Sequence, residues 1–183
     1  LPYFPPSKKS VSLRPYQKDH FEQICDIFSV YPVAVDGSQT RRGKSFVGAL
    51  IAKYYRLEVL VIGPASLAGT VWNKLFNEYD LGPYAGFVSY DKLKLGSNNL
   101  CIRGVNGQGL LKSQKADIVN ARVRAGKETV SVFQPTELLI SMLHSGILII
   151  VDEAHLLKNP TSRNRAVSTV ISTLLSDPIA RKR

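Results

Sequence analysis

Short, uninterrupted apolar runs alternate along this chain with longer segments whose apolar residues recur every three or four positions. The two clearest runs are residues 59–62 and 147–151, and each is bounded by charged residues, glycine or proline. A continuous apolar run of this length is typical of a strand that is buried on both faces. Such strands alternating with amphipathic helices predict an α/β fold, with a parallel sheet and helices on both faces.

This alternation divides the chain into a lead-in, one domain and an insertion. We expect residues 1–12 to be an extended lead-in and residues 13–183 to form the domain. Within it we expect strands at residues 33–35, 58–63, 86–90 and 147–151, and helices at residues 14–29, from 44 onward, 66–79, 135–144 and 162–175. Residues 95–131 break the pattern, and we interpret them as a basic insertion in which residues 110–124 are expected to be helical.

The charge balance favours a polyanionic partner. Lys and Arg number 24 against 14 Asp and Glu among the 183 residues, a formal net charge of +10 at pH 7. Nucleic acid is such a partner, although a basic surface also occurs on domains that do not bind it. The insertion is itself basic; we interpret it first as a solvated loop, and a DNA contact is the second choice. Its basic residues are Arg103, Lys112, Lys115, Arg122, Arg124 and Lys127, against Asp117 and Glu128.

Two cysteines, Cys25 and Cys101, lie far apart, and neither has Cys or His neighbours at metal-ligand spacing. This argues against a zinc site and a disulfide framework, and it favours a reducing, intracellular compartment. The longest apolar run, residues 147–151, is too short to cross a bilayer, and no signal peptide is visible. We therefore expect no membrane contact.

A phosphate-binding loop is predicted where residues 36–45 read Asp-Gly-Ser-Gln-Thr-Arg-Arg-Gly-Lys-Ser. Gly43 lets the backbone approach a phosphate, Lys44 can place its ammonium near the outer phosphates, and Ser45 can bind Mg²⁺. The helix that starts there points its backbone N–H groups at the anion. The alternative is a surface turn that contains Gly-Lys-Ser by chance.

Two acidic residues follow the apolar run at residues 147–151. Asp152 and Glu153 would emerge at the carboxyl end of the strand, the edge where open α/β sheets bind their ligands. We expect Asp152 to hold Mg²⁺, directly or through water, and Glu153 to orient or deprotonate an attacking water. His155 could link the nucleotide site to neighbouring elements. The alternative is a pair of acids that caps the next helix.

The order Gly-Lys-Ser and then Asp-Glu-Ala-His resembles the superfamily-two helicases and translocases. The longer string at residues 152–162, DEAHLLKNPTS, is most similar to the Swi/Snf-type branch, the double-stranded-DNA translocases. Three further segments agree: residues 13–17 resemble the opening motif of that branch, residues 63–67 with Trp72 resemble the motif that contacts a tracking strand, and residues 89–93 resemble the following strand-contact motif. The resemblance spans residues 13–171 and leaves residues 95–131 unmatched.

This resemblance implies a RecA-like P-loop NTPase domain, the first of two motor domains, that binds ATP and Mg²⁺ and contacts one DNA strand. It implies that Gln17 reads adenine and that a second RecA-like domain supplies an arginine finger. The residues that it implies for the contact with the DNA strand are Ser66, Thr70, Tyr90 and Lys92. Because the chain begins with Leu1 and stops before the Ser/Thr-Ala-Thr motif of the family, we expect a fragment whose sheet is incomplete at the C-terminus and which is inactive by itself.

We therefore predict the ATP-binding domain of a DNA-dependent ATPase, with Lys44, Asp152 and Glu153 as its catalytic residues. A motor on duplex DNA is expected in the nucleus, with a cytoplasmic or viral compartment as alternatives. Arg41 and Arg42 stand where such loops usually carry small residues; they could contact phosphate, reach nucleic acid or weaken nucleotide binding. A nucleic-acid-binding module with a degenerate nucleotide site is thus one alternative. An RNA helicase of the same superfamily is another, although Lys-Asn-Pro at residues 158–160 favours DNA.

Overall fold

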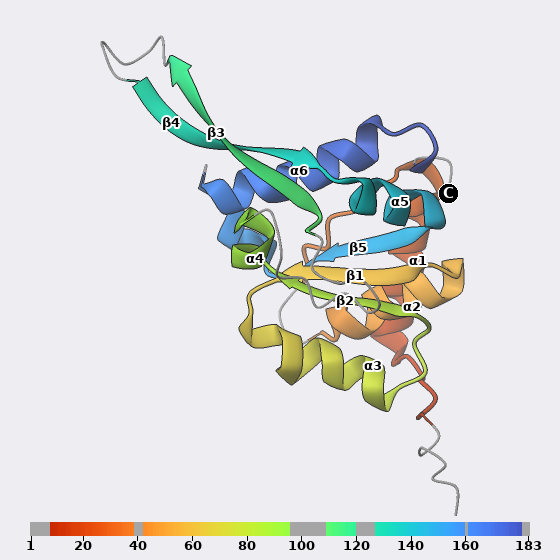
Figure 1. Cartoon of the computed structure of the whole chain (residues 1–183). Helices are drawn as coiled ribbons and strands as arrows, with labels where there is room; N and C mark the ends of the chain where they lie inside the picture. Colours follow the sequence, from red (N-terminus) through yellow and green to blue (C-terminus); the bar gives the residue numbers. More distant parts are fainter. Residues whose placement is uncertain (1–7, 39–41, 96–108, 120–126, 160, 181–183) are drawn as a thin grey trace, which may run out of the picture.

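The computed structural model describes residues 8–38, 42–95, 109–119, 127–159 and 161–180 (Figure 1). The strands are β1 (Glu58–Gly63), β2 (Tyr84–Ser89), β3 (Leu111–Val119), β4 (Lys127–Pro135) and β5 (Ile147–Val151). The α-helices are α1 (Pro15–Val30), α2 (Lys44–Tyr55), α3 (Lys74–Glu78), α4 (Tyr90–Leu95), α5 (Glu137–Ser145) and α6 (Ser162–Ser176). A π-helical segment, η1 (Ala68–Asn73), runs into α3, and a 3₁₀ turn, η2 (Ala154–Leu157), follows β5.

Three parallel strands form the central sheet in the order β2-β1-β5. The central strand β1 is fully buried from Val59 to Ile62, as its continuous apolar run predicts. The matching prediction for β5 is wrong, because all five of its residues are only half-buried. The reason is its position: among the described residues, β5 has a neighbouring strand on one side only.

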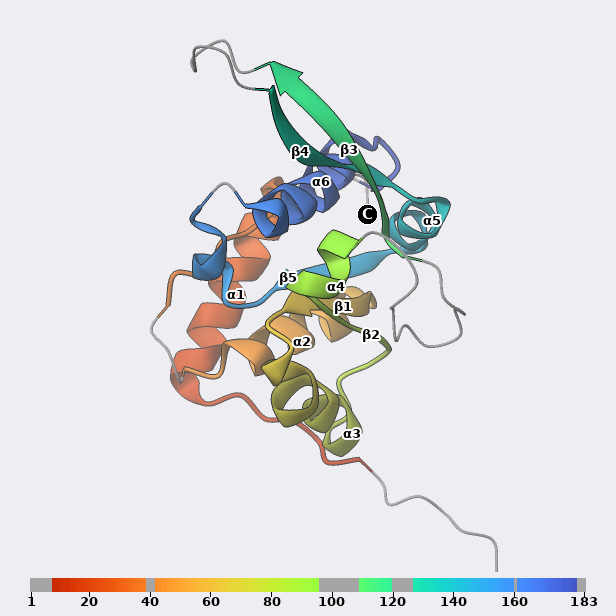
Figure 2. The same ribbon diagram turned by 60° about the vertical axis from the view of Figure 1, so that its left-hand side comes forward.

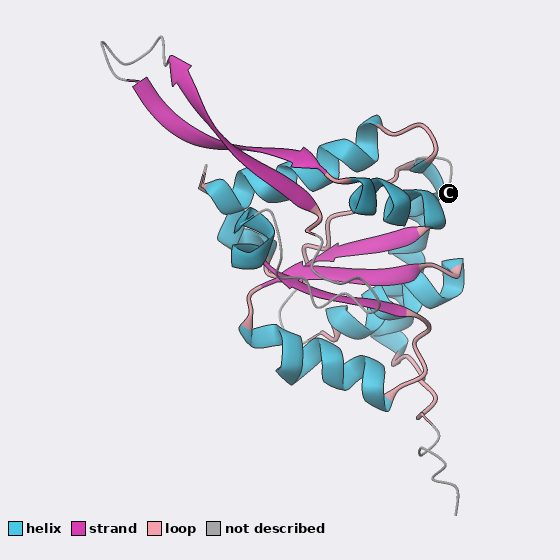
Figure 3. Ribbon diagram, in the orientation of Figure 1, coloured by secondary structure: helices cyan, strands magenta, loops and turns pink. Residues whose placement is uncertain are grey.

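Helices cover both faces of this sheet, which confirms the predicted α/β class (Figures 1 and 3). On one face, α2, η1 and α3 pack against a set that includes Val59, Val61 and Ile150. On the other face, α4, α5 and α6 pack against a set that includes Leu60 and Ile62. Alternation along the strands therefore divides the core into two clusters, one on each side of the sheet.

The strand expected at residues 33–35 is absent, and these residues form an extended loop between α1 and α2. Val33 is partly exposed and the Val35 side chain is 88% exposed. No strand in the described part of the chain pairs with this segment, so its apolar residues gain neither ladder hydrogen bonds nor burial. The phosphate-loop motif is thus preceded by an irregular segment.

Most of the other expected elements are confirmed, with small shifts at their ends. The helix expected at residues 66–79 is present, although its middle is π-helical. Tyr90 opens α4 and does not end β2. Thr136 caps α5, where its hydroxyl oxygen accepts from the Leu139 N–H, and Thr161 caps α6 in the same way. Across the described residues, every helix is too short or too polar to cross a bilayer.

Part of the insertion is an antiparallel hairpin of β3 and β4, so the helix expected at residues 110–124 is wrong. Leu111 pairs with Pro135 at the base and Val119 pairs with Lys127 at the far end. Leu110, Leu111 and Phe133 are buried at the base, and the hairpin extends away from the body of the domain (Figure 2). The β-branched residues of β4 favour a strand. Arg103, Arg122 and Arg124 lie outside the described residues.

Candidate functional site

The phosphate-loop helix and the carboxylate strand reach the same edge of the sheet. α2 ends at Tyr55 and β1 begins only three residues later, so α2 runs antiparallel to β1 and to its parallel neighbour β5. A Cβ atom on Gly48 would lie 3.1 Å from Ile150 Cδ1, so the first turns of α2 pack directly on the end of β5. The start of α2 therefore lies at the carboxyl edge of the sheet, beside the position where Asp152 leaves β5.

The spacing along both elements agrees with this placement. Lys44 precedes Gly48 by four helical residues, which is about 6 Å along the helix axis. Asp152 follows Ile150 by two residues, which is about 7 Å along a strand. Both residues therefore extend past the shared contact in the same direction and by a similar distance. The structure brings the Gly43–Ser45 segment and Asp152 to one edge, as the two motifs require.

The Asp152 carboxylate is held by two donors. Its Oδ2 accepts from Trp72 Nε1 at 2.8 Å, and its Oδ1 accepts from the Glu153 backbone N–H at 2.9 Å. Trp72 is only 1% exposed and belongs to the core cluster that also contains α2, so this carboxylate lies on the α2 side of the sheet. These bonds fix its orientation before any ligand arrives.

Tyr90 holds the backbone of the same residue from the other core cluster. Its hydroxyl donates to the Asp152 carbonyl oxygen at 2.5 Å, and its side chain is 3% exposed. Burial, together with the negative charges of Asp152 and Glu153, raises the pKa of Tyr90 to about 12, so the hydroxyl stays a donor at neutral pH. The sequence predicts that Tyr90 contacts a nucleic-acid strand, and a contact through its hydroxyl would have to break this hydrogen bond.

Glu153 follows Asp152 in a left-handed backbone conformation, with φ of 54°. Its Oε2 lies 3.0 Å from His155 Nδ1, and both side chains are exposed. An exposed pair of this kind adds little stability, so it holds the Glu153 side chain only weakly. This pair joins His155 to its own segment, which leaves the expected link to other elements a prediction.

The loop before α2 folds back on its own lysine. Lys44 Nζ donates to the Ser38 carbonyl oxygen at 2.5 Å, and Asp36 Oδ1 accepts from the Ser38 N–H at 2.9 Å. Gly43 adopts φ of +77°, a conformation that side chains disfavour. Ser45 is partly buried in the first turn of α2. Arg41 lies outside the described residues.

Gln17 is buried against this loop. Its Oε1 accepts from the Arg14 N–H at 3.0 Å, and its Nε2 donates to the Arg42 carbonyl oxygen at 3.3 Å. A Cβ on Gly43 would lie 2.2 Å from that nitrogen, so the glycine is needed here for close approach as well as for its φ. The Arg42 guanidinium lies 5.5 Å from the centre of the Tyr16 ring, a cation–π contact. Gln17 therefore contacts the phosphate loop, and its contact with adenine stays a prediction.

The other expected nucleic-acid contacts lie on the surface. Ser66 and Thr70 are exposed, and the Thr70 hydroxyl donates to the Ser66 carbonyl oxygen at 2.6 Å. Lys92 is exposed and lines a groove of about 530 Å³ between the η1–α3 segment and β2. The groove also includes Ala65 and Ala68, which flank Ser66 in the chain. Ser66 and Lys92 are thus near one groove, and their contact with a nucleic-acid strand stays a prediction.

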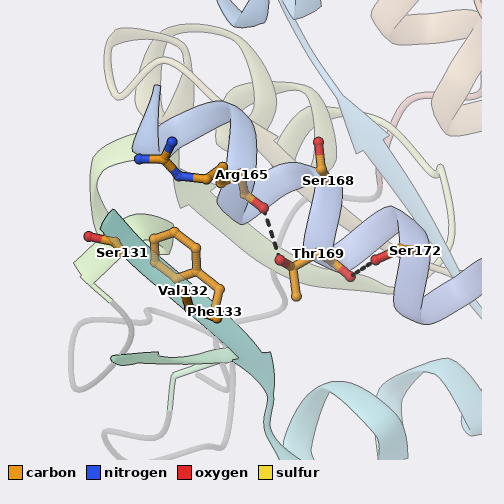
Figure 4. A pocket seen from close by; sticks show the side chains of 7 residues that line it. All are labelled: Ser131, Val132, Phe133, Arg165, Ser168, Thr169 and Ser172. Atoms are coloured by element: carbon orange, nitrogen blue, oxygen red, sulfur yellow. Dashed lines mark hydrogen bonds between the residues drawn. The ribbon is translucent and has the colours of Figure 1, made fainter. Parts of the chain in front are cut away.

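A second hollow, of about 340 Å³, lies on the other side of the sheet between β4 and α6 (Figure 4). Phe133 of β4 faces a helix stripe that carries Arg165 and hydroxyl side chains. The Thr169 and Ser172 hydroxyls donate to carbonyl oxygens of α6 itself, at 2.9 and 3.1 Å. This hollow belongs to the core cluster opposite α2, so it is separate from the Lys44 edge.

Two contacts were missed from the sequence. The bond from Trp72 to Asp152 joins residues 80 positions apart, and no local pattern reports such a pair. His20 Nε2 lies 3.2 Å from Asp36 Oδ1 at the start of the phosphate loop. A signal for the second contact was present, because His20 lies three residues after Gln17 and so shares its face of α1.

Comparison of the chain with protein-family models, with curated proteins and with solved structures gave no match in any of the three. The described residues also contain no cluster of three or more His, Cys, Asp or Glu side chains that could hold a metal. The Asp152 carboxylate and the Ser45 hydroxyl would suffice for Mg²⁺, because this ion keeps several waters and is usually bound together with substrate phosphates. The functional argument therefore depends on the geometry of the edge where α2 meets β5.

Proposed function

We propose that this chain is the ATP-binding domain of a nucleic-acid-dependent ATPase, a helicase-like translocase that acts on duplex DNA. The observation that carries the proposal is the packing of Gly48 on Ile150. It supports a common site for the Lys44 ammonium and the Asp152 carboxylate at the carboxyl edge of a parallel sheet. The α/β architecture is compatible with a RecA-like domain, and the ordered motifs favour that assignment.

The residues at this edge would divide the work of phosphoryl transfer. Lys44 would neutralise charge on the outer phosphates, while the N–H groups at the start of α2 would donate hydrogen bonds to the phosphate oxygens. Ser45 and Asp152 would hold Mg²⁺, which when bound screens the phosphate charge and orients the leaving group. Glu153 would position the attacking water and take its proton. Gln17 and Arg42 would contact the nucleotide from the side of α1.

Ligand binding at this site exchanges contacts that already exist. In the structure Lys44 Nζ is hydrogen-bonded to the Ser38 carbonyl, and a phosphate would replace that carbonyl as its partner. Because an ionised acceptor forms a stronger bond than a neutral carbonyl, the exchange favours the bound state. Asp152 keeps both donors, since each carboxylate oxygen has more than one lone pair to offer.

The test is ATP binding and hydrolysis by the full-length protein, with and without duplex DNA. Lys44→Ala is expected to lower the rate of hydrolysis at least about 100-fold, in line with other losses of one preorganised charge partner. Glu153→Gln is expected to keep ATP binding and lose hydrolysis. The matched control is Lys53→Ala, which removes an exposed lysine at the other end of α2 that pairs with Asp80 at 2.7 Å. Equal hydrolysis by the Lys44→Ala and Lys53→Ala variants would sink the proposal.

The second candidate is a nucleic-acid-binding module with a degenerate nucleotide site. It is favoured by the missing strand at residues 33–35 and by the Lys44–Ser38 bond, which leaves the amine engaged without a ligand. Calorimetry separates the two candidates: the module predicts no binding of Mg²⁺·ATP, and the motor predicts micromolar affinity. An RNA helicase is distinguished by comparing stimulation of hydrolysis by RNA and by duplex DNA.

The proposed motor also needs a partner domain. A second RecA-like domain would close the site and supply an arginine to the developing charge, so residues 1–183 alone are expected to hydrolyse ATP very slowly. Adding the rest of the protein, or the separate second domain, should restore hydrolysis. A motor on chromosomal DNA would act in the nucleus.

A further inference from the structure

Helix α1 contacts both ends of the phosphate loop through two residues that are one turn apart. Gln17 donates to the Arg42 carbonyl at the end of the loop, as described above. His20 lies three residues later, and its Nε2 is 3.2 Å from Asp36 Oδ1 at the start of the loop. Residues at this spacing share one face of a helix. A single face of α1 therefore fixes where the loop begins and where it ends.

The His20–Asp36 contact is sheltered from solvent. The two side chains are 17% and 25% exposed, so water and salt screen the contact less than they would on the open surface. Burial alone would raise the pKa of Asp36, but the hydrogen bond from the Ser38 N–H and the nearby His20 and Lys44 hold it below its usual value. Asp36 is therefore ionised at neutral pH and can only accept, which assigns the shared proton to His20 Nε2.

Asp36 also orients the backbone group that contacts Lys44. The same Oδ1 atom that faces His20 accepts from the Ser38 N–H at 2.9 Å. That bond orients the Ser38 peptide, and the Ser38 carbonyl oxygen accepts from Lys44 Nζ. A continuous chain of contacts thus runs from His20 through Asp36 and Ser38 to the Lys44 ammonium.

We propose that His20 and Asp36 are positioning residues for Lys44: they hold the loop so that its lysine waits at the site where the outer phosphates bind. The inference rests on the proposed function, because it assumes that Lys44 meets a nucleotide. Neither residue touches the ligand, so both act through the loop. Their loss raises the dissociation constant for Mg²⁺·ATP more than it lowers the rate of hydrolysis at saturation.

The test is a double-mutant cycle in the full-length protein, with Mg²⁺·ATP affinity measured by calorimetry. His20→Phe, which keeps a ring and removes the N–H donor, and Asp36→Asn are each expected to weaken ATP binding about tenfold, the effect of losing one hydrogen bond to a charged group. Because the two residues act as one unit, the double variant should be no weaker than either single variant. His20→Lys, which again places an N–H donor beside Asp36, should recover most of the affinity.

A matched control exists on the other side of the sheet. His144 Nε2 lies 2.8 Å from Asp177 Oδ2, a His–Asp pair that joins α5 to the end of α6. His144→Phe is expected to leave ATP affinity unchanged, even if the melting temperature falls. Should His20→Phe unfold the protein, Asp36→Asn alone carries the test, because Asp36 lies in a loop.

Three results would overturn the inference, and they separate it from the proposed function. ATP affinity that is the same in His20→Phe and in the unmodified protein removes the positioning role alone. Additive losses in the double variant show that the two residues act independently, which also contradicts it. Absence of Lys44-dependent ATP binding in the unmodified protein removes the proposed function, and the inference with it.

Discussion

Replacing Trp72 by phenylalanine tests how the structure holds its principal carboxylate. Trp72 Nε1 donates to Asp152 Oδ2 at 2.8 Å from a side chain that is almost fully buried. Trp72→Phe keeps an aromatic ring in the core and removes the donor. The Asp152 carboxylate then keeps only the Glu153 N–H as a hydrogen-bond donor within the described residues.

The expected cost has two parts. A hydrogen bond to a charged group contributes about 1.5–3 kcal/mol, and the lower half of that range applies because Asp152 is only half-buried. The smaller ring leaves a gap in the core cluster around Phe76 and Ile150, which costs about 1 kcal/mol more. We therefore expect Trp72→Phe to lower the free energy of unfolding by about 2.5–3.5 kcal/mol.

The assay is urea unfolding followed by far-UV circular dichroism, because the variant lacks the only tryptophan. Tyr84→Phe is the matched control: it removes a ring hydroxyl whose partner is the neutral Asn73 Oδ1, at 3.2 Å on the surface, and should cost less than about 1 kcal/mol. A cycle with Asp152→Ala should give a coupling energy of about 1–2 kcal/mol. A coupling near zero, or equal losses for Trp72→Phe and Tyr84→Phe, would refute the reasoning.

Three further predictions concern the loop before α2 and the backbone at Asp152. Because the folded-state pKa of Asp36 lies below the unfolded value, near 3.9, its contacts stabilise the fold above that pH and are lost as the pH falls through the folded value; Asp36→Asn should flatten the acid side of a stability–pH curve. Gly43→Ala should destabilise the protein by about 1–2 kcal/mol and weaken ATP binding, because its φ is +77° and Gln17 blocks the new methyl group, whereas Gly37→Ala has open space and should do neither. Tyr90→Phe removes the donor to the Asp152 carbonyl and should cost about 1–2 kcal/mol in the same urea assay.

The parts of the fold that could be predicted are those whose signal is local. The continuous apolar run of β1 predicts a buried strand, and the periodic apolar residues of α2 predict a helix. Propensity, burial and topology all agree with these two assignments. The place of Asp152 at the carboxyl edge of the sheet also follows from a local rule, because Asp152 directly follows a parallel strand. The structure confirms these elements and this placement, whereas Lys44 follows an irregular segment to which the strand rule does not apply.

The failures arise where a neighbour decides the outcome. Residues 33–35 have the composition of a strand but no strand beside them in the described chain, so propensity alone did not suffice. The hairpin of β3 and β4 was missed because many of its residues are polar, so the alternation of apolar and polar residues that indicates a strand is weak there. The same limit applies to Trp72 and Asp152, which meet only after the sheet has formed.

The central claim is that Lys44 and Asp152 serve one metal-bound triphosphate, and the single tryptophan offers a direct measurement. Trp72 gives one indole N–H signal in a nitrogen–proton NMR spectrum, and that N–H group is bonded to the Asp152 carboxylate. When Mn²⁺, which is paramagnetic, replaces Mg²⁺, its ATP complex is expected to broaden this signal beyond detection, and Lys44→Ala should prevent the broadening. An indole signal that stays sharp at saturating Mn²⁺·ATP would contradict the account, because the metal would then lie elsewhere.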